Sequence, residues 1–283
     1  MSGTEAARVQ PDQPRPPAHD ACTRRRHRLA PDPATRWQEA APLVAHERGV
    51  LVRDDSTLDK PYARKLGLVP RHWSGKHRRV VQGSTLLTLR WTDGEALIPG
   101  DDRRDEQAVD RLSKHDHCQA LLATAAARGV SPEAVVCDSW YASLDNLTQL
   151  RRQGWRWLTR LKANRLVNPA GAGNRPLGEC AIAGTGTRVH LHGSGFVLVF
   201  RIVTPDGDTE SWATDDLALT ELQRRKYAEF AWGSEGYHRG LKPPCGVARA
   251  EARAARAQRH HIGCVSRALL RLEQHRLVTG VSW

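Results

Sequence analysis

The chain of 283 residues has no long apolar run and no closely spaced pair of cysteines. Its longest unbroken aliphatic and aromatic stretch is Phe196–Phe200, whereas a helix that spans a bilayer needs roughly 20 apolar residues. The N-terminal region lacks the apolar core of a secretory signal. The six cysteines are scattered, which excludes a disulfide framework and a zinc ribbon and suits a reducing cytoplasm. We therefore expect a cytoplasmic protein without a membrane segment.

Several familiar motifs of enzymes are also missing. The sequence contains no phosphate-binding P-loop, no dinucleotide-binding glycine motif and no serine-nucleophile elbow. Two histidine clusters, at residues 115–118 and 190–192, lack the spacing or the partners of a metal site. We expect no nucleotide cofactor and no zinc site.

Positive charge exceeds negative charge along the chain. Lys and Arg number 43 against 31 Asp and Glu, which gives a net charge of +12 and a pI near 10.0. Residues 221–283 hold 12 basic and five acidic residues, so 12 − 5 = +7 of this excess lies at the C-terminal end. Such a helical end could lie along a phosphate backbone, or it could be a solvated face whose Arg stems cover apolar surface. The overall excess favours a polyanionic partner, and DNA before a membrane.

The composition divides the chain into four regions. Residues 1–45 hold seven of the 16 prolines and the basic cluster Arg24–Arg28, and we expect a largely disordered tail there. Residues 46–169 carry the strand and helix patterns of the first part of a core. Residues 170–216 are rich in glycine turns and β-type runs, which predicts a β-rich insertion. Residues 217–283 are helical in character and would complete the core.

The order of the apolar patterns in the core predicts an α/β fold. Hairpin-linked strands precede strand–helix–strand units, and this order implies a mixed sheet flanked by helices. It is compatible with a ribonuclease-H-like core. The expected strands are residues 49–53, 79–91, 95–98, 134–137 and 156–161, with a turn at 92–94, and the expected helices are 102–128, 144–153, 217–242 and 248–277.

Two aspartates directly follow apolar strands. Asp54 comes after Val50–Arg53, and Asp138 comes after Val135–Cys137. A carboxylate at the mouth of a buried strand has a rigid base and an exposed head, and Mg²⁺ prefers oxygen ligands of this kind. An aspartate at a strand end can also simply begin a turn or cap a helix. Either aspartate alone fits both interpretations.

A third acid lies in a helical segment with basic neighbours. Glu235 is followed by basic residues three, four and seven positions later, a spacing that places all of them on one face of a helix. These residues are His238, Arg239 and Lys242. The group could be a salt-bridged surface, or it could be a metal ligand beside a clamp for phosphate.

Three segments together resemble the DDE transposases of bacterial insertion sequences. The first is residues 54–63 with His72–Gly75, the second runs from 136–141 to 161–165, and the third runs from 232–242 to 258–262. The chain is similar to the insertion-sequence-four superfamily and, within it, to the subgroup numbered seven hundred and one. The segments occur in family order and cover most of the core, with the β-rich insertion between the second and third acids.

The resemblance implies a ribonuclease-H-like fold and a catalytic triad. Asp54, Asp138 and Glu235 match the three acids of the family, which are expected to hold two Mg²⁺ or Mn²⁺ ions. Asp55 is adjacent to Asp54, and the family pattern favours the first of the pair. The implied reaction is cleavage of DNA at the ends of the element and strand transfer into target DNA.

The resemblance also assigns DNA contacts and partners. Lys242 matches the signature lysine of the family, and Arg239 and His238 would join it in binding DNA. A homodimer on paired element ends is implied, in the cytoplasm of a bacterium and associated with the nucleoid. DNA is thus the expected partner, both as element ends and as target.

The chain departs from the family pattern at two places. The superfamily signature has a tyrosine seven residues before the glutamate and an arginine four before it, where this chain has Ala228 and Ala231. The family also carries a longer region ahead of the first acid, which is consistent with a truncated copy. Two other functions stay open: a catalytically weak remnant that only binds DNA, and a ribonuclease-H-like nuclease that cuts without strand transfer.

Overall fold

The computed structural model describes residues 32–60, 79–105, 110–204, 206–249 and 254–282, and the backbone alone of residues 71–74. Most of the expected tail, including Arg24–Arg28, lies outside the described residues. The chain divides into two compact units. The sheet unit comprises Pro42–Ser56 and Leu86–Tyr237, and the terminal unit comprises Met1–Ala41, Thr57–Thr85 and His238–Trp283.

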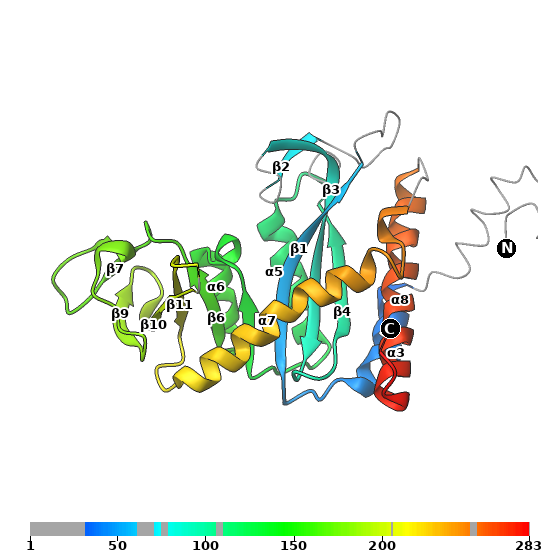
Figure 1. Ribbon diagram of the computed structural model, residues 1–283. Helices are drawn as coiled ribbons and strands as arrows, with labels where there is room; N and C mark the ends of the chain where they lie inside the picture. Colours follow the sequence, from blue (N-terminus) through cyan, green and yellow to red (C-terminus); the bar gives the residue numbers. More distant parts are fainter. Residues whose placement is uncertain are drawn as a thin grey trace, which may run out of the picture. The chain divides into compact units, whose positions relative to one another are not determined.

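The sheet unit is built on a mixed β-sheet (Figure 1). β1 (Val50–Asp59), β5 (Ala134–Cys137) and β6 (Trp157–Leu161) are parallel neighbours, and β11 (Thr209–Thr214) pairs antiparallel with β6. On one side the strand order continues β11–β10–β9–β7–β8, and on the other side β1 neighbours β3, which pairs with β4. These strands are β3 (Arg79–Thr92), β4 (Ile98–Arg104), β7 (Leu166–Asn168), β8 (Arg175–Pro176), β9 (Thr187–Leu191) and β10 (Gly195–Val203). The ribonuclease-H-like mixed sheet predicted from the sequence is confirmed.

Helices cover both faces of this sheet, as predicted. α7 (Glu221–Leu241) crosses one face, and α5 (Lys114–Ala127) and α6 (Leu144–Arg152) lie on the other face (Figure 1). Ser113 begins α5 with a capping box, and Ser143 caps α6, so both helices start where a side chain satisfies the first backbone amides. None of the helices in the described ranges is both long and apolar enough to cross a bilayer.

An apolar cluster between α7 and the sheet forms the core on that face. Val50 and Val52 of β1 and Ala134 and Val136 of β5 all belong to it, and Tyr227 of α7 packs on them. Because side chains alternate along a strand, the even-numbered residues in this part of β1 and β5 face α7. The odd-numbered residues therefore face α5 and α6.

The β-rich insertion extends the core sheet. β8, β9, β10 and β11 fall within residues 170–216, and β7 begins just before them. β11 pairs with β6 from Ser211–Leu161 to Thr214–Leu158, which joins the insertion to the parallel strands. The boundaries of the predicted regions at residues 46–169, 170–216 and 217–283 stay predictions.

The helix predicted over residues 102–128 is wrong in its first part. Ile98–Arg104 forms β4, antiparallel to β3, and α5 begins only at Lys114. The turn at residues 92–94 is confirmed, but its partner strand follows later than the expected 95–98. β4 pairs with β3 at the side of the sheet, where polar residues are tolerated. The strand can therefore carry the charged run Asp101–Arg104, which in the sequence is more typical of the first turns of a helix than of a strand.

Two helices dominate the described part of the terminal unit, together with β2 (Arg71–Ser74), which pairs with β3. α3 (Pro33–Ala40) is capped by Asp32, and α8 (Ala255–Thr279) ends at Gly280. The sequence assigns residues 33–43 to the disordered tail, but they form α3 and the 3₁₀ helix η1 (Ala41–Leu43). The helix is stabilised by docking, because Glu39 lies 2.6 Å from Arg267 of α8.

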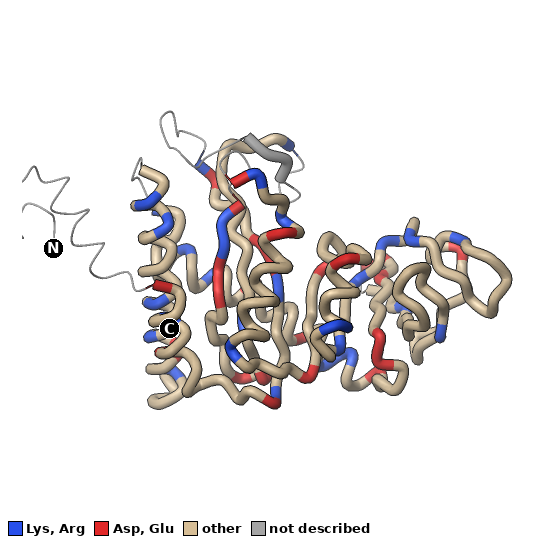
Figure 2. The backbone as a smooth tube through the Cα atoms, turned by 180° about the vertical axis from the view of Figure 1, so that it is seen from behind, with Lys and Arg blue, Asp and Glu red and all other residues tan. Residues whose placement is uncertain are grey.

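Basic residues are distributed along α8 (Figure 2). Arg267 and Arg271 form ion pairs with Glu39 at 2.6 and 3.2 Å, and Arg276 pairs with Glu273 at 2.7 Å. Part of the C-terminal positive charge therefore stabilises helix packing. For these three arginines, the structure supports a role in folding over contact with a phosphate backbone.

Candidate active site

Asp54 and Asp138 lie next to each other where the pairing of β1 with β5 ends. Asp138 follows the last residue of β5, whereas β1 continues past Asp54 to Asp59, beyond the strand expected over residues 49–53. β1 and β5 are parallel and in register up to Arg53 and Cys137, and the two aspartates are the next residues in each strand direction. The charge of Asp138 contributes to raising the pKa of Asp54, so the two carboxylates lie within electrostatic reach. The structure thus brings together two of the three predicted acids.

The neighbouring Asp55 takes the opposite face of β1. Its Oδ2 accepts a hydrogen bond from the Tyr141 hydroxyl at 2.9 Å and lies 3.1 Å from Lys114 Nζ of α5. By alternation Asp54 faces α7, the helix that carries Glu235. Asp55 already forms an ion pair with Lys114. Of the two adjacent aspartates, Asp54 is the one on the sheet face that α7 and its Glu235 cover.

Burial disfavours ionisation of both Asp54 and Asp138. Burial raises the pKa of Asp54 to about 6, and the charges of Asp138 and Asp55 add to this, while the Asp55 amide and Arg90 oppose it. Burial also raises the pKa of Asp138; Asp55 adds to that rise and Arg53 opposes it. Asp54 and Asp138 are thus two partly buried carboxylates whose charged forms are disfavoured in the absence of a cation. Their oxygen atoms fit a hard divalent cation.

We expect the metal-free protein to lose stability as the pH rises from about 4 to about 6. Asp54 has an ordinary pKa of 3.8 and a folded pKa of about 6, so in this window the folded state holds a proton that the unfolded chain has released. The free energy of unfolding then falls with pH, by up to about 3 kcal/mol from this group. Urea unfolding in EDTA across this range measures the slope. The Asp54→Asn variant should give a flatter curve, and equal slopes would contradict the assignment.

Arg90 is a buried cation that connects β3 to α7. Its guanidinium donates to the Ser234 hydroxyl at 3.1 Å, to the Phe230 carbonyl and to the Ala231 carbonyl at 3.4 Å. Burial lowers the pKa of Arg90 to about 10, and the charges of Tyr237 and Asp54 oppose this. The buried Arg90 guanidinium therefore interacts both with Asp54 and with the middle of α7.

Glu235 follows Ser234 on α7, and its side chain is exposed. Within the described ranges, no group of three or more His, Cys, Asp or Glu side chains is arranged to hold a metal ion. The structure places Glu235 on the helix that covers the Asp54 face, in the same unit as both aspartates. The three-acid site stays a prediction.

The three predicted DNA-binding residues lie at the end of α7. α7 continues to Leu241, and the Lys242 amide donates to the His238 carbonyl at 3.2 Å, so the helical spacing after Glu235 is as predicted. His238, Arg239 and Lys242 belong to the terminal unit. Their contacts with DNA stay a prediction.

The two departures from the superfamily signature have a packing role here. Ala228 and Ala231 are partly buried against the core cluster. Tyr227, one residue away from the signature position, is buried, and its hydroxyl donates to Glu133 at 2.8 Å. This stretch of α7 packs on the sheet through small side chains and one anchored tyrosine.

Sequence reasoning missed the two buried arginines beside the aspartates. Arg53 donates to the Cys118 sulfur, and its guanidinium lies 3.7 Å from the centre of the Tyr141 ring. Arg90 is equally buried on β3. The available signal was a charged residue inside an apolar strand, as in Val52-Arg53 and Leu89-Arg90. Their partners depend on how distant segments pack.

The sequence matches a known protein family, and one solved structure is similar to the chain. The family model described as DDE superfamily endonuclease matches residues 6–177, more than half of the chain and including both strand-end aspartates. The chain therefore belongs to this family. The cryo-EM structure of the piggyBac transposase synaptic complex with hairpin DNA is similar at 11% identity and a TM-score of 0.49, over 83% of this chain and 49% of that one. The chain thus spans about half the length of that transposase, and no curated protein sequence matches it.

Proposed function

We propose that this chain is a transposase that cuts DNA at the ends of an insertion sequence and transfers the cut strands to target DNA. Membership in the DDE superfamily endonuclease family supports the nuclease step. The observation that carries the proposal is the pair Asp54 and Asp138, which lie one residue beyond the last paired residues of the adjacent parallel strands β1 and β5, within electrostatic reach of each other. The sequence resemblance supports the subgroup numbered seven hundred and one.

The proposed metal ligands are Asp54, Asp138 and Glu235. Their carboxylates would hold two Mg²⁺ or Mn²⁺ ions, which lower the pKa of a water or a DNA 3′-hydroxyl and stabilise the departing oxygen. The fold supports this assignment because strands fix the two aspartates rigidly at their base. Arg90 holds α7 against β3 next to Glu235 and keeps a positive charge beside Asp54.

The proposed DNA contacts are Lys242, Arg239 and His238. Charge-assisted hydrogen bonds from such side chains to phosphate oxygens would hold the strand in line for attack. Each element end needs one active site, so the proposal includes a homodimer on paired ends. The proposed location is the bacterial cytoplasm, at the nucleoid.

The test is cleavage of a plasmid that carries the gene with its own flanking DNA. With Mn²⁺, the full-length wild-type protein should release the element and give joined products, and Asp138→Ala should lower the rate at least about 1,000-fold. Asp215→Asn is a matched control, because this buried aspartate accepts from the Trp157 amide at 3.0 Å at the opposite end of β6. It should cleave like the wild type.

Two outcomes would contradict the proposal. Cleavage without joined product would identify a nuclease that lacks strand transfer. DNA binding that falls steeply with salt, ignores Mg²⁺ and is unchanged by Asp138→Ala, without any cleavage, would identify a remnant that only binds DNA.

A further inference from the structure

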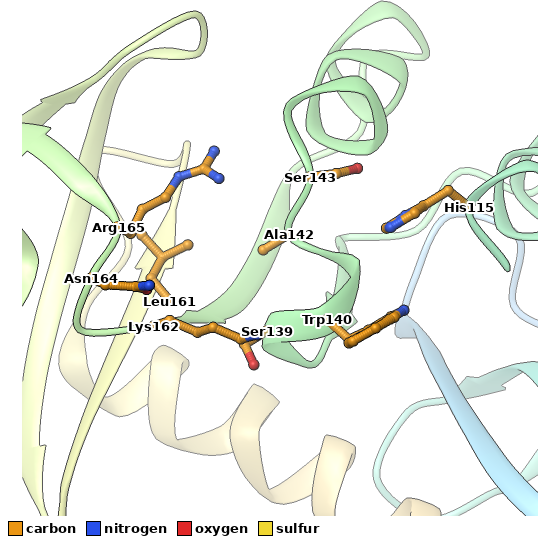
Figure 3. Close-up of a pocket in the computed structure, with 9 residues that line it drawn as sticks. All are labelled: His115, Ser139, Trp140, Ala142, Ser143, Leu161, Lys162, Asn164 and Arg165. Atoms are coloured by element: carbon orange, nitrogen blue, oxygen red, sulfur yellow. The ribbon is translucent and has the colours of Figure 1, made fainter. Parts of the chain in front are cut away.

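A pocket of about 280 Å³ lies in the sheet unit next to Asp138 (Figure 3). Its walls come from the 3₁₀ helix η2 (Ser139–Tyr141), the start of α6, one residue of α5 and the connection between β6 and β7. Trp140 lines the pocket, and its amide donates to Asp138 Oδ1 at 3.0 Å. One residue that lines the pocket is therefore hydrogen-bonded to one of the proposed catalytic carboxylates.

Trp140 presents an open aromatic surface at this pocket. The residue is 54% exposed. Lys114 Nζ and Lys162 Nζ each lie 5.8 Å from the centre of its ring, near the outer limit of cation–π attraction. Lys114 also lies 3.1 Å from Asp55, which balances its charge, and Lys162, which lines the pocket, brings positive charge to the rim. Proteins that bind single strands use this combination, with bases stacked on an aromatic ring and cations along the backbone.

The opposite wall offers groups that bind phosphate and base edges. Figure 3 shows Asn164 and Arg165 on the side of the pocket away from Trp140, and the Lys162 side chain reaching between the two sides, with its ammonium 5.8 Å from the Trp140 ring centre. Ala142, which is buried, adds an apolar surface between the two sides. No Asp or Glu is among the described residues that line the pocket, so its own charge is positive. An anionic ligand with a flat ring matches both walls.

We propose that this pocket binds one unpaired nucleotide of a DNA strand, with its base on Trp140 and its phosphate on Lys162 and Arg165. The inference rests on the proposed function, because it places the nucleotide beside Asp138, where the strand would be cut. The volume is close to the lower limit of small-molecule pockets, about 300 Å³, which suits one nucleotide. A base inside a duplex is already stacked and paired, so only an unpaired base can offer its face to Trp140.

The test uses the full-length protein in EDTA, so that no cleavage occurs, and two DNA probes. One probe is a duplex with a short unpaired 3′ overhang that contains 2-aminopurine, and the other is the same duplex with the overhang paired. We expect tighter binding to the overhang probe and quenching of its 2-aminopurine fluorescence by stacking on the indole. Equal binding to both probes without quenching would overturn the proposal.

Variants of Trp140 separate stacking from a general loss of structure. Trp140→Leu should weaken binding to the overhang probe about tenfold, abolish the quenching and leave binding to the paired duplex unchanged, whereas Trp140→Phe should retain most of the affinity. Phe196→Leu is the matched control, because Phe196 is 49% exposed under the Arg188 guanidinium, at 4.0 Å, outside the pocket. Quenching that survives Trp140→Leu, or equal weakening on both probes, would contradict the proposal.

A competition experiment identifies the source of the nucleotide. Free deoxyadenosine monophosphate offers the same base and phosphate without a strand. If it displaced the probe as well as unlabelled overhang DNA does at equal concentration, the pocket would be a site for free nucleotides and the proposal would be overturned.

The plasmid experiment keeps this inference separate from the proposed function. Quenching that depends on Trp140, in a protein that never cleaves DNA, would contradict transposition and support the nucleotide pocket. Cleavage that depends on Asp138, without any quenching, would support the proposed function and overturn the pocket.

Discussion

Replacing Asp54 by Asn should abolish Mn²⁺-dependent DNA cleavage and at the same time make the metal-free protein more stable. Loss of one carboxylate ligand should slow cleavage at least about 1,000-fold, which corresponds to about 4 kcal/mol. Near neutral pH the same change removes a partly buried charge that burial and the charge of Asp138 disfavour, so the free energy of unfolding should rise by up to about 3 kcal/mol. A variant that loses activity and gains stability is expected where a protein holds functional groups together at a cost in stability.

The comparison needs cleavage assays with Mn²⁺ and urea unfolding in EDTA on the same preparations. Asp215→Asn is again the matched control, because burial also raises the pKa of Asp215 and its removal should likewise not destabilise the fold. This control should keep full cleavage. If Asp54→Asn lost stability together with activity, Asp54 would have a structural role and the metal-ligand assignment would be contradicted.

Replacing Arg90 by Met should destabilise the protein and shift its pH–rate profile to higher pH. The change removes the hydrogen bonds to Phe230 and Ser234 and leaves Asp54 without its nearby cation. Loss of one partner from a buried polar network of this kind costs about 3 kcal/mol or more. With the cation removed, the pKa of Asp54 rises further, so cleavage should need a higher pH to reach its plateau.

Two variants distinguish a positioning role of Arg90 from a purely structural one. Arg90→Lys keeps the charge and should restore the pH–rate profile while recovering only part of the stability. Arg201→Met removes a guanidinium that donates to the carbonyls of Cys180 and Leu177 at 2.8 and 2.6 Å in the β-rich insertion. It should destabilise the protein without moving the profile. An unshifted profile in Arg90→Met would contradict the role assigned to Arg90.

The elements with apolar patterns were predictable from the sequence, and those defined by their neighbours were not. β5 and α6 have buried apolar residues at the expected period, and the structure has them close to the expected bounds. β4 is charged, and it becomes a strand because it pairs with β3. Arg128, the residue that follows α5, lies 3.5 Å from Asp101 of β4. α3 likewise follows a proline-rich segment and depends on the ion pairs of Glu39 with α8.

The proximity of Asp54 and Asp138 was predictable from the sequence, because both follow apolar runs that pair as parallel strands in β1 and β5. The continuation of β1 to Asp59 was not, because residues 54–59 lack an apolar pattern. The sequence alone could not show which of Asp54 and Asp55 points toward Glu235, because that depends on which face of the sheet α5 covers and which face α7 covers. Arg53 and Arg90 could not be assigned roles from the sequence, because their contacts lie on α5, η2 and α7, far away in the chain.

A crystal of the full-length protein soaked in MnCl₂ would show, through the anomalous scattering of manganese, whether the proposed acids bind metal. We predict anomalous peaks within coordination distance of the Asp54 and Asp138 carboxylates, with Glu235 completing the ligand set, and their loss in Asp138→Asn crystals. Manganese bound elsewhere, with Glu235 turned away from both aspartates and no peak beside them, would contradict this prediction.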